Sequence, residues 1–423
     1  MAQLTDDCFA FAGPLMPIAE MERLIEARIT PVAETEEVPL RAALGRVLAR
    51  DLVAGLDLPP FDNSAVDGFA IRHADLAATG ATRLAVVDRV TAGAAAARPL
   101  GAHAAIRIFT GAPMPQGADT VFMQEDVEVD GDAVVLPEGL KVGANRRLAG
   151  EDIRRGALAL PAGRRLAARD LALAAAIGVT TLTVRRRLRV ALFSTGDEVV
   201  EPGAPRHASA IYDANRYLLA GLLQTFGAEV TDLGILADDP AALQPALARA
   251  AEGHDLVLTS GGVSTGEADH VRAAVEAIGK LVFWRVAIKP GRPVAMGVIP
   301  GGASGAAAFV GLPGNPAAVF VTFVRVVRPL LLRLAGAAAT PLAPLPVRAA
   351  FPYRKRSGRR EYVRVALRTG ADGTIEAVKY AQDGAGVITS LTETAGLVEL
   401  AEDVTTIEPG ATVGFLSYAA LAD

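Results

Sequence analysis

The stretch DLVLTSGGVSTGEADHVRAAVEAIG, residues 255–279, runs from an apolar strand pattern through a glycine-rich turn into an amphipathic helix pattern. Within it, residues 259–270 contain three glycines and four small hydroxyl residues, followed by the carboxylates Glu267 and Asp269. The apolar run in 255–260 predicts a buried strand, and the helical spacing of apolar residues in 269–279 predicts a helix. The stretch therefore predicts one strand–turn–helix unit.

The same unit is repeated along the neighbouring sequence. Strand patterns in RVALFST and AEVTDLGIL alternate with helix patterns in ANRYLLAGLLQTF and PAALQPALARAAE. Two more apolar strands, PVAMGVI and AAAFVGL, precede a helix from 317 to about 334. Short apolar strands that alternate with helices predict an α/β domain with a doubly wound, mostly parallel sheet.

The remaining sequence has other patterns, as expected for a chain of 423 residues with several domains. An amphipathic helix is expected over 17–29, a β-rich module over about 52–136, and a short strand with an alanine-rich helix over about 145–184. AGAAATPLAPLP is typical of a linker. Strand patterns in EYVRVALR, TIEAVKY and LVELA after it predict a small β-barrel or sandwich.

Composition and charge limit the class of protein. The formal net charge is −5, so the general basic surface of nucleic-acid-binding proteins is absent. We expect a cytoplasmic protein without membrane spans, because acidic residues stand where a signal peptide needs positive charge and no apolar run reaches about 18 residues. The single cysteine, Cys8, excludes cysteine-based metal clusters. Oxygen ligands would have to hold any bound metal, which favours Mg²⁺.

Three candidate site segments follow strands of the predicted α/β sheet. Ligands of such sheets bind outside the carboxyl ends of the strands. Backbone N–H groups in glycine turns can bind an anion, and the glycine at 262 would leave room for the oxygens of a ligand. Nearby carboxylates could hold Mg²⁺ against a phosphate. The segments are Ser194, Thr195, Gly196, Asp197 and Glu198; Gly261, Gly262 and Ser264; and Pro313, Gly314, Asn315 and Pro316.

Simpler interpretations of these segments stay open at this point. A glycine-rich turn after a strand can be a plain connection to the next helix. Asp269 can act as an N-terminal cap of that helix, and Asp197 and Glu198 can be solvated turn residues.

A fourth polar stretch, LPPFDNSAVDGFAI, lies in the β-rich module and contains Asp67. It can be a functional turn or an ordinary Asx-turn. The segments around Thr110 and NRRLAGEDI, which contains Asp152, add further polar residues. None of these is specific when taken singly.

Together and in this order, the stretches resemble the molybdopterin molybdenumtransferase family, which comprises the MoeA proteins and the gephyrin E domain. The runs that carry the resemblance extend from Phe61 to Pro316. They are FDNSAVDGFA, TGAPMPQGADTV, NRRLAGEDI, STGDEVVEPG, IYDANRYLL, LGILADDP, TSGGVSTGEADH, AIKPGRP and LPGNP.

The resemblance implies a cytoplasmic homodimer that inserts molybdenum from molybdate into adenylylated molybdopterin and releases AMP, assisted by Mg²⁺. It implies a transient contact with the preceding adenylyltransferase, and a site completed between protomers. The implied fold has four parts. They are a discontinuous helical and linker domain at 1–50 plus 145–187, an inserted β-rich domain at 51–144, an α/β domain at 188–337 and a C-terminal β-barrel at 338–423.

Carried over residue by residue, the resemblance also implies roles for individual side chains. Catalytic roles fall to Asp67, Asp152, Glu198, Asp238, Asp269 and Lys289. Substrate binding falls to Thr110, Ser194, Thr195, Gly196, Gly261, Gly262, Ser264, Arg285, Arg292, Pro313, Gly314, Asn315 and Pro316. Metal binding by Asp197, Glu198 and Asp269 is predicted from the carboxylates of the strand-end segments themselves. Arg285 and Arg292 stand where the family often has lysine, so the charge is kept but the geometry of the contact changes.

Two other functions are compatible with parts of this pattern. The adenylyltransferase that acts before this step resembles the α/β unit, but it is a single small domain. A gephyrin-like scaffold that binds a partner peptide would leave the acids dispensable.

Overall fold

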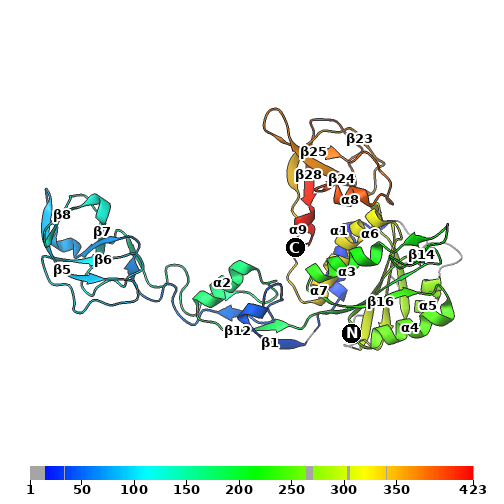
Figure 1. Cartoon of the computed structure of the whole chain (residues 1–423), viewed down its shortest axis with the longest axis horizontal. Helices are drawn as coiled ribbons and strands as arrows, with labels where there is room; N and C mark the ends of the chain where they lie inside the picture. Colours follow the sequence, from blue (N-terminus) through cyan, green and yellow to red (C-terminus); the bar gives the residue numbers. More distant parts are fainter. Residues whose placement is uncertain (1–14, 33, 263–269, 303–304, 340, 423) are drawn as a thin grey trace.

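The computed structural model describes residues 15–32, 34–262, 270–302, 305–339 and 341–422. Figure 1 shows an elongated molecule, with a β-rich sheet at one end and an α/β domain beside a β-barrel at the other. A slender middle part that contains α2 (Ala168–Ala176) and β12 (Thr181–Arg185) connects the two ends. In the described part of the chain, no helix is long and apolar enough to cross a membrane.

The α/β domain is built on a six-stranded sheet with the order β16-β13-β17-β21-β20-β18. The strands are β13 (Arg189–Thr195), β16 (Glu229–Leu236), β17 (Leu256–Ser260), β18 (Lys280–Arg285), β20 (Pro293–Pro300) and β21 (Ala306–Leu312). The first four in the sheet order are parallel, whereas β20 pairs antiparallel with both β21 and β18, so that β20 alone runs in the opposite direction within this sheet. The predicted mostly parallel sheet is confirmed, although the sequence patterns did not predict β18.

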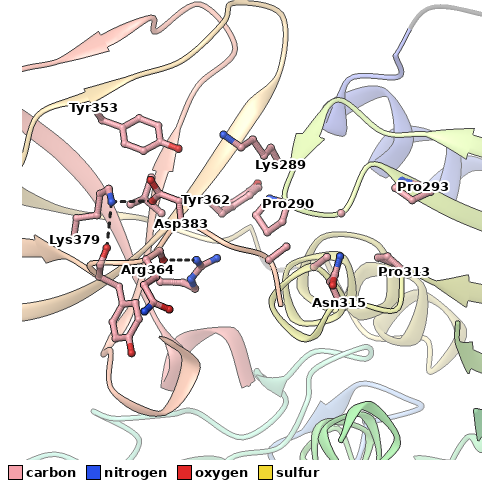
Figure 2. Close-up of a pocket in the computed structure, with 16 residues that line it drawn as sticks. Lys289, Pro290, Pro293, Pro313, Asn315, Tyr353, Tyr362, Arg364, Lys379 and Asp383 are labelled. Carbon is pink, nitrogen blue, oxygen red and sulfur yellow. Dashed lines mark hydrogen bonds and ion pairs between the residues drawn. The ribbon is translucent and has the colours of Figure 1, made fainter. Parts of the chain in front are cut away.

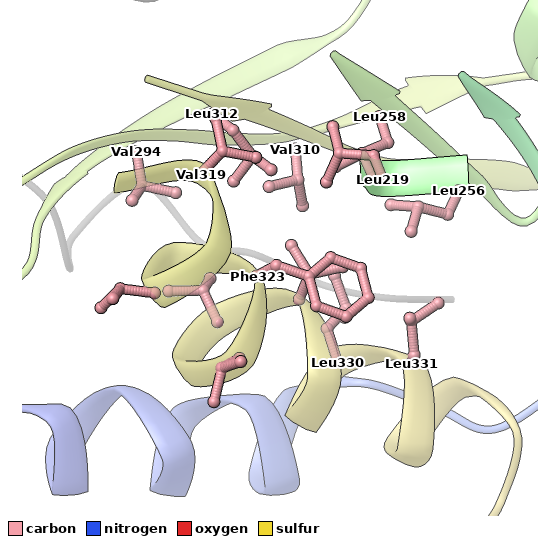
Figure 3. Close-up of a cluster of buried hydrophobic side chains, with 14 of the residues drawn as sticks. Leu219, Leu256, Leu258, Val294, Val310, Leu312, Val319, Phe323, Leu330 and Leu331 are labelled. Carbon is pink, nitrogen blue, oxygen red and sulfur yellow. The ribbon is translucent and has the colours of Figure 1, made fainter. Parts of the chain in front are cut away.

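Helices cover both faces of this sheet. They are α1 (Ile18–Arg28), α3 (Asn215–Thr225), α4 (Pro240–Glu252), α5 (His270–Ile278), α6 (Pro316–Thr322), a π-helical turn (Phe323–Val327) and α7 (Arg328–Leu334). Leu256 and Leu258 of β17 face a core with α1, α3, α6 and α7, whereas Val257 faces a core with α4 and α5. Figure 3 shows the first core, in which Val310 of the sheet lies opposite Phe323. Apolar residues on both faces explain the continuous apolar strands.

The position of α1 differs from the expectation that residues 1–50 belong to the discontinuous domain. Ile18, Met21 and Ile25 are buried in the same core as the α/β strands and α7. Glu22 of α1 also accepts a hydrogen bond from Arg325, with 2.9 Å between Oε1 and Nη2. The apolar stripe of α1 needs a matching apolar surface, and α7 with the π-helical turn supplies one. Residues 18–28 therefore pack as part of the α/β domain.

The C-terminal region forms a closed five-stranded barrel. Its strands are β22 (Leu345–Ala349), β24 (Arg360–Thr369), β25 (Ile375–Lys379), β26 (Gly396–Leu400) and β28 (Thr412–Ser417). The ring β24-β25-β22-β28-β26 closes because β26 also pairs with β24. Smaller elements here are β23 (Tyr353–Arg354), β27 (Thr406–Ile407), α8 (Thr389–Thr392) and α9 (Tyr418–Ala422). The predicted C-terminal barrel is confirmed.

The far end of the molecule carries a second six-stranded sheet with the order β7-β4-β6-β5-β9-β8. The strands are β4 (Gly68–Ile71), β5 (Thr82–Val90), β6 (Ala104–Ile108), β7 (Thr120–Met123), β8 (Glu128–Asp130) and β9 (Ala133–Leu136). Two 3₁₀ turns, His73–Asp75 and Gln124–Asp126, lie beside it. The expected β-rich module is this sheet.

The middle part is held by short antiparallel pairs between segments far apart in the sequence. β1 (Thr35–Pro39) pairs with β12, β2 (Leu52–Val53) with β11 (Leu158–Leu160), and β3 (Asn63–Ser64) with β10 (Arg146–Arg147). A 3₁₀ turn at Leu40–Ala42 packs on α2. These pairs bring the two ends of the β-rich insertion together.

Candidate functional site

The four parallel strands end at one edge of the α/β sheet. Ser194 of β13 lies opposite Ser260 of β17, which lies opposite Leu312 of β21, and Thr195 lies opposite Leu236 of β16. Each strand is followed by a segment that the sequence singled out. Asp238, the Gly196–Glu198 turn, the Gly261–Gly262 turn and the Pro313–Pro316 loop therefore form a row along this edge. Ser264 and Asp269 lie outside the described residues.

The two glycines after β17 are required by packing within the protein. Gly261 has φ +90°, and a Cβ there would lie 2.7 Å from the backbone oxygen of Thr195. Gly262 has φ +66°, and a Cβ there would lie 2.4 Å from Cγ2 of Val271. We expected the space at Gly262 to admit ligand oxygens, but Val271 and Thr195 occupy that direction. The glycines thus permit a tight turn after β17, in which the backbone N of Gly261 donates to the backbone oxygen of Leu312 at 3.1 Å.

Several buried polar atoms at this edge have no hydrogen-bond partner among the described residues. They are Ser194 Oγ, Thr195 Oγ1, Asn215 Oδ1, Asp238 Oδ1 and Thr259 Oγ1. Buried polar groups in folded proteins are nearly always hydrogen-bonded, so such a group of unpaired atoms indicates a place for a polar ligand or water. Ser194, Thr195 and Asp238 were predicted from the sequence, whereas Asn215 and Thr259 were not.

Asn215 connects two segments of the row. Its Nδ2 donates to Ser260 Oγ at 2.8 Å and to the backbone oxygen of Gly314 at 2.7 Å. The first residue of α3 thus fixes the end of β17 relative to the Pro313–Pro316 loop. Asn215 was not singled out because an asparagine at the start of a helix is usually explained by local turn geometry.

The carboxylates of the row influence one another. Burial raises the pKa of the Asp238 carboxyl above its ordinary value; Asp197 and Glu198 raise it further, and His270 opposes the shift. Glu198 is folded over Gly196, since a Cβ at Gly196 would lie 2.8 Å from Glu198 Oε2. Within the described residues, no three His, Cys, Asp or Glu side chains are arranged to hold a metal. Two of the three predicted metal ligands, Asp197 and Glu198, are exposed and lie at this edge.

A pocket of about 310 Å³ lies between the α/β domain and the barrel (Figure 2). The α/β domain lines it with Lys289, Pro290, Gly291, Pro293, Pro313, Asn315 and Ala318. The barrel lines it with Tyr353, Tyr362, Val363, Arg364, Lys379, Tyr380, Gln382, Asp383 and Ala385. Three of the predicted residues, Lys289, Pro313 and Asn315, are therefore brought together here with barrel side chains.

Three cations give this pocket its positive character. Lys289 pairs with Glu361 at 3.1 Å, and Lys379 pairs with Asp383 at 2.8 Å. Arg364 is buried, and its Nη2 donates to the backbone oxygens of Gln382 at 3.0 Å and Gly384 at 3.2 Å.

The remaining hydrogen-bonding capacity of Arg364 makes it a candidate ligand-binding residue. Its Nε is buried and has no hydrogen-bond partner in the described structure. Burial lowers the pKa of its guanidinium, so an anion in the pocket would compensate for the lost hydration of that charge. The pocket is suited to an oxyanion or a phosphate. Sequence reasoning missed Arg364 and Lys379 because they lie in the barrel, far along the chain from the recognised motifs.

The two arginines predicted to bind anions lie outside this pocket. Arg285 ends β18 and Arg292 precedes β20, and both are exposed. Neither of them lines the pocket. Their predicted role in substrate binding stays a prediction.

Asp67 and Thr110 form their own cluster in the insert. Both the backbone N and Oγ1 of Thr110 donate to Asp67 Oδ1, at 2.8 and 2.7 Å. These bonds lower the pKa of Asp67. Asp152 is exposed at the base of the insert. Figure 1 shows the insert sheet at the opposite end of the molecule from the α/β sheet, so Asp67 does not reach the strand ends of its own protomer.

The fold and these sites define a multidomain α/β protein with buried polar side chains at the strand ends and a pocket lined by lysine and arginine against a C-terminal barrel. Three family descriptions match consecutive parts of the chain: MoeA N-terminal region (domain I and II) at 16–178, probable molybdopterin binding domain at 191–333, and MoeA C-terminal region (domain IV) at 346–418. The chain belongs to the molybdopterin molybdenumtransferase, or MoeA, family of molybdenum cofactor biosynthesis.

Individual relatives agree with this assignment over nearly the whole chain. The molybdopterin molybdenumtransferase of Haemophilus influenzae is 36% identical over 90% of this chain and 93% of its own length. Molybdopterin molybdenumtransferase 2 of Mycobacterium tuberculosis is 34% identical over 93% of this chain and 97% of its own length. The crystal structure of the molybdopterin biosynthesis MoeA protein from Pyrococcus horikoshii OT3 superposes with a TM-score of 0.79 at 30% identity, covering 96% of this chain and 100% of that one.

Proposed function

We propose that this protein inserts molybdenum from molybdate into adenylylated molybdopterin and releases AMP. The observation that carries the proposal is the row of strand ends, whose buried polar atoms lack partners in the described part of the chain, next to a pocket against the barrel that is lined by Lys289, Arg364 and Lys379. Both features suit a substrate with several anionic groups. The family assignment and the names of the relatives supply the chemical identity of that substrate.

The strand-end row would bind the phosphate-bearing part of the substrate. The backbone N of Gly261 already donates to the backbone oxygen of Leu312 at 3.1 Å, whereas the buried hydroxyls of Ser194 and Thr259 have no hydrogen-bond partner in the described structure and would serve as donors. Such donors bind phosphate oxygens without a charged side chain. The pocket with Lys289, Arg364 and Lys379 would bind molybdate, because guanidinium and ammonium groups bind oxyanions through charge-assisted hydrogen bonds.

Mg²⁺ is the cofactor that fits the carboxylates of the row. Mg²⁺ prefers oxygen ligands and is often held by one or two carboxylates together with substrate phosphates. Asp238 has a buried carboxylate oxygen without a hydrogen-bond partner among the residues that the structure describes, and Asp197 and Glu198 lie close enough to raise its pKa. Glu198 and Asp197 would hold the ion with Asp269. When bound, it would neutralise the charge of the adenylate.

The side chains of the chain would then act by position and charge. Donor groups of the strand-end row hold the substrate phosphate while an oxygen of water or of molybdate attacks the adenylate phosphorus. The P–O bond to the molybdopterin phosphate breaks, its bridging oxygen stays on that phosphate, and the adenylate keeps the attacking oxygen. Attack by water gives AMP directly, and attack by molybdate gives an adenylyl-molybdate that water hydrolyses to AMP and molybdate. Lys289 and Arg364 hold molybdate near the sulfurs that receive the metal. No covalent nucleophile is required, since the reaction exchanges an adenylate for a metal.

The protein is proposed to act as a cytoplasmic homodimer. Asp67 and Thr110 lie at the end of the molecule opposite the strand-end row, so a single protomer does not bring the predicted acids together. A partner protomer could supply its own insert to this row. Transient contact with the preceding adenylyltransferase would deliver the substrate.

The two alternative functions have less support. A single-domain adenylyltransferase would lack the parts that match the MoeA N-terminal and C-terminal regions. A scaffold would not need buried polar atoms at the strand ends that lack partners among the described residues.

Release of AMP tests the proposed reaction directly. Purified protein is incubated with adenylylated molybdopterin, and AMP is measured with and without molybdate and Mg²⁺. We expect release only when both are present, and we expect it to survive a zinc-selective chelator because the candidate ligands are oxygens. AMP release that is independent of molybdate, or that stops when zinc is removed, would contradict the proposal.

A further inference from the structure

Glu361 is a buried carboxylate immediately behind the cationic pocket. Its side chain is only 1% exposed, and three donors from three different segments surround it. Glu361 Oε2 accepts from Lys289 Nζ at 3.1 Å and from the Tyr353 hydroxyl at 2.9 Å. Glu361 Oε1 accepts from Arg359 Nε at 2.8 Å. Of these four residues, Lys289 and Tyr353 line the pocket, whereas Glu361 does not.

The backbone places Glu361 opposite Lys289. β19 (Ile288–Lys289) leaves the α/β domain and pairs in parallel with β24 of the barrel, with Lys289 opposite Glu361. The backbone N of Arg360 donates to the backbone oxygen of Ala287 at 2.7 Å and extends this pairing. The lysine and its carboxylate partner therefore belong to two domains that meet at this strand pair.

The charge balance of the cluster leaves Lys289 available to a ligand. Burial acts to raise the pKa of Glu361, but hydrogen bonds from Tyr353, Lys289 and Arg359 hold the pKa below its ordinary value. One carboxylate is thus shared by two cations. The Lys289 side chain is still 46% exposed, so its ammonium group can meet a second anion while it stays on Glu361.

We propose that Glu361 is a positioning residue that fixes Lys289 at the pocket before the oxyanion binds. A free lysine side chain loses rotamer freedom when it binds a ligand, and a lysine that is already held loses less. This inference rests on the proposed function of the pocket as the molybdate site. Glu361 itself makes no contact with the ligand.

Binding of molybdate alone to the full-length protein tests the inference. Its dissociation constant is measured by calorimetry for wild type, Glu361→Gln, Lys289→Ala and the double variant. The glutamine side chain would keep an oxygen for Lys289 but place an amide N–H₂ against Arg359 and remove the charge. We expect Lys289→Ala to weaken molybdate binding by roughly 10-fold, as for loss of one charge-assisted hydrogen bond, and Glu361→Gln by roughly 10-fold at most, because Lys289 must then lose its rotamer freedom when the ligand binds. The double variant should bind no more weakly than Lys289→Ala.

Kinetics provide a second readout that a general loss of structure would not give. The KM for molybdate should rise in Glu361→Gln, while the KM for adenylylated molybdopterin stays at the wild-type value. Glu376→Gln is the matched control, because Glu376 is also a barrel carboxylate that accepts from two arginines, Arg348 at 3.0 Å and Arg368 at 2.8 Å, but does not line the pocket. It should leave the molybdate dissociation constant unchanged.

Tyr353→Phe keeps the inference testable if Glu361→Gln fails to fold. It removes one hydrogen bond from Glu361 and keeps the carboxylate, so we expect about 2- to 3-fold weaker molybdate binding that disappears in the Lys289→Ala background. If Glu361→Gln or Tyr353→Phe raises the molybdate dissociation constant by the same factor with and without Lys289→Ala, the positioning role is overturned. Unchanged molybdate binding by Lys289→Ala would instead overturn the proposed pocket function, and this inference with it.

Discussion

At Gly262 the backbone conformation and the close neighbours both exclude a side chain. The φ of +66° costs an ordinary residue about 1–2 kcal/mol, and a Cβ would lie 2.4 Å from Val271 Cγ2 and 2.8 Å from Thr195 Cγ2. We therefore expect Gly262→Ala to lower the free energy of unfolding by about 2–4 kcal/mol, whether or not a ligand is bound. Chemical denaturation without substrate measures the effect.

Gly314 is the matched control for this substitution. It follows β21 at the same edge, and a Cβ there would meet no atom within 4 Å. Gly314→Ala should change the free energy of unfolding by less than about 0.5 kcal/mol. If Gly314→Ala is stable but binds substrate more weakly, the ligand must lie against Gly314. Wild-type stability of Gly262→Ala combined with weaker substrate binding would restore the interpretation that ligand oxygens fill that space.

Asp238 is expected to reduce stability when it is ionised. Burial and the charges of Asp197 and Glu198 raise its pKa in the folded protein above the unfolded value of 3.8. The folded state then binds the proton more tightly, so stability is full below the unfolded pKa and is lost as the pH rises through the folded pKa. Asp238→Asn should therefore raise Tm by about 1–3 °C at pH 8 relative to wild type, with a smaller gain at pH 4.

Magnesium and a neighbouring substitution control this measurement. Mg²⁺ stabilises ionised carboxylates, so 10 mM Mg²⁺, on the order of ten times a weak dissociation constant, should raise the Tm of wild type more than that of Asp238→Asn. Asp239→Asn should be nearly neutral, since Asp239 caps α4 through Ala242 N at 2.9 Å and asparagine caps equally well. If the Tm of Asp238→Asn lies below that of wild type at pH 8, the ionised carboxylate is stabilised by hydrogen bonds or ion pairs in the folded protein, and the prediction is wrong.

Among the elements, those with strong periodicity could be predicted from the sequence. β13, β17 and β21 are apolar on both faces and are followed by turn residues, which together indicate a buried parallel strand that ends at a site. The resulting row of strand ends was therefore predictable. The Thr259 hydroxyl, which is buried without a hydrogen-bond partner in the described ranges, was not predictable, because such burial is a property of the tertiary structure.

The elements at the junction with the barrel could not be predicted. β19 has two residues, and its partner β24 lies about seventy positions later in the chain. A strand of two residues has no period to recognise, and the pairing is set by the docking of the two domains. The roles of Arg364 and Glu361 could not be predicted for the same reason. Their neighbours come from both the α/β domain and the barrel, and only domain docking brings them together.

At the scale of the whole molecule, the acidic residues predicted to be catalytic lie in two distant parts of the protomer. The middle part is a narrow set of short strand pairs, and it holds the insert with Asp67 away from the α/β sheet with Glu198. An elongated arm of this kind buries little surface of its own protomer. In a symmetric dimer, the insert of each protomer could contact the α/β domain of its partner. The two-fold axis makes this contact occur twice.

Complementation between two inactive variants tests whether the site is shared between protomers. Asp67→Asn changes only the insert, and Glu198→Gln changes only the strand-end row. In a heterodimer with shared sites, one site carries both substitutions and the other carries neither. Random exchange makes about half of the dimers heterodimers, so a 1:1 mixture should recover roughly a quarter of the wild-type AMP release.

A second pair of variants shows whether such a recovery reflects sharing. Glu198→Gln mixed with Asp238→Asn places both substitutions on the same edge of the same sheet, so every site of every dimer carries one of them. No recovery is expected from that mixture. Exchange itself is followed by mass spectrometry of isotopically labelled protomers. Heterodimers that form from Asp67→Asn and Glu198→Gln but release no more AMP than the parent variants would show that each protomer works with its own acids. The elongated arm would then have to bend back onto its own α/β domain for Asp67 to take part.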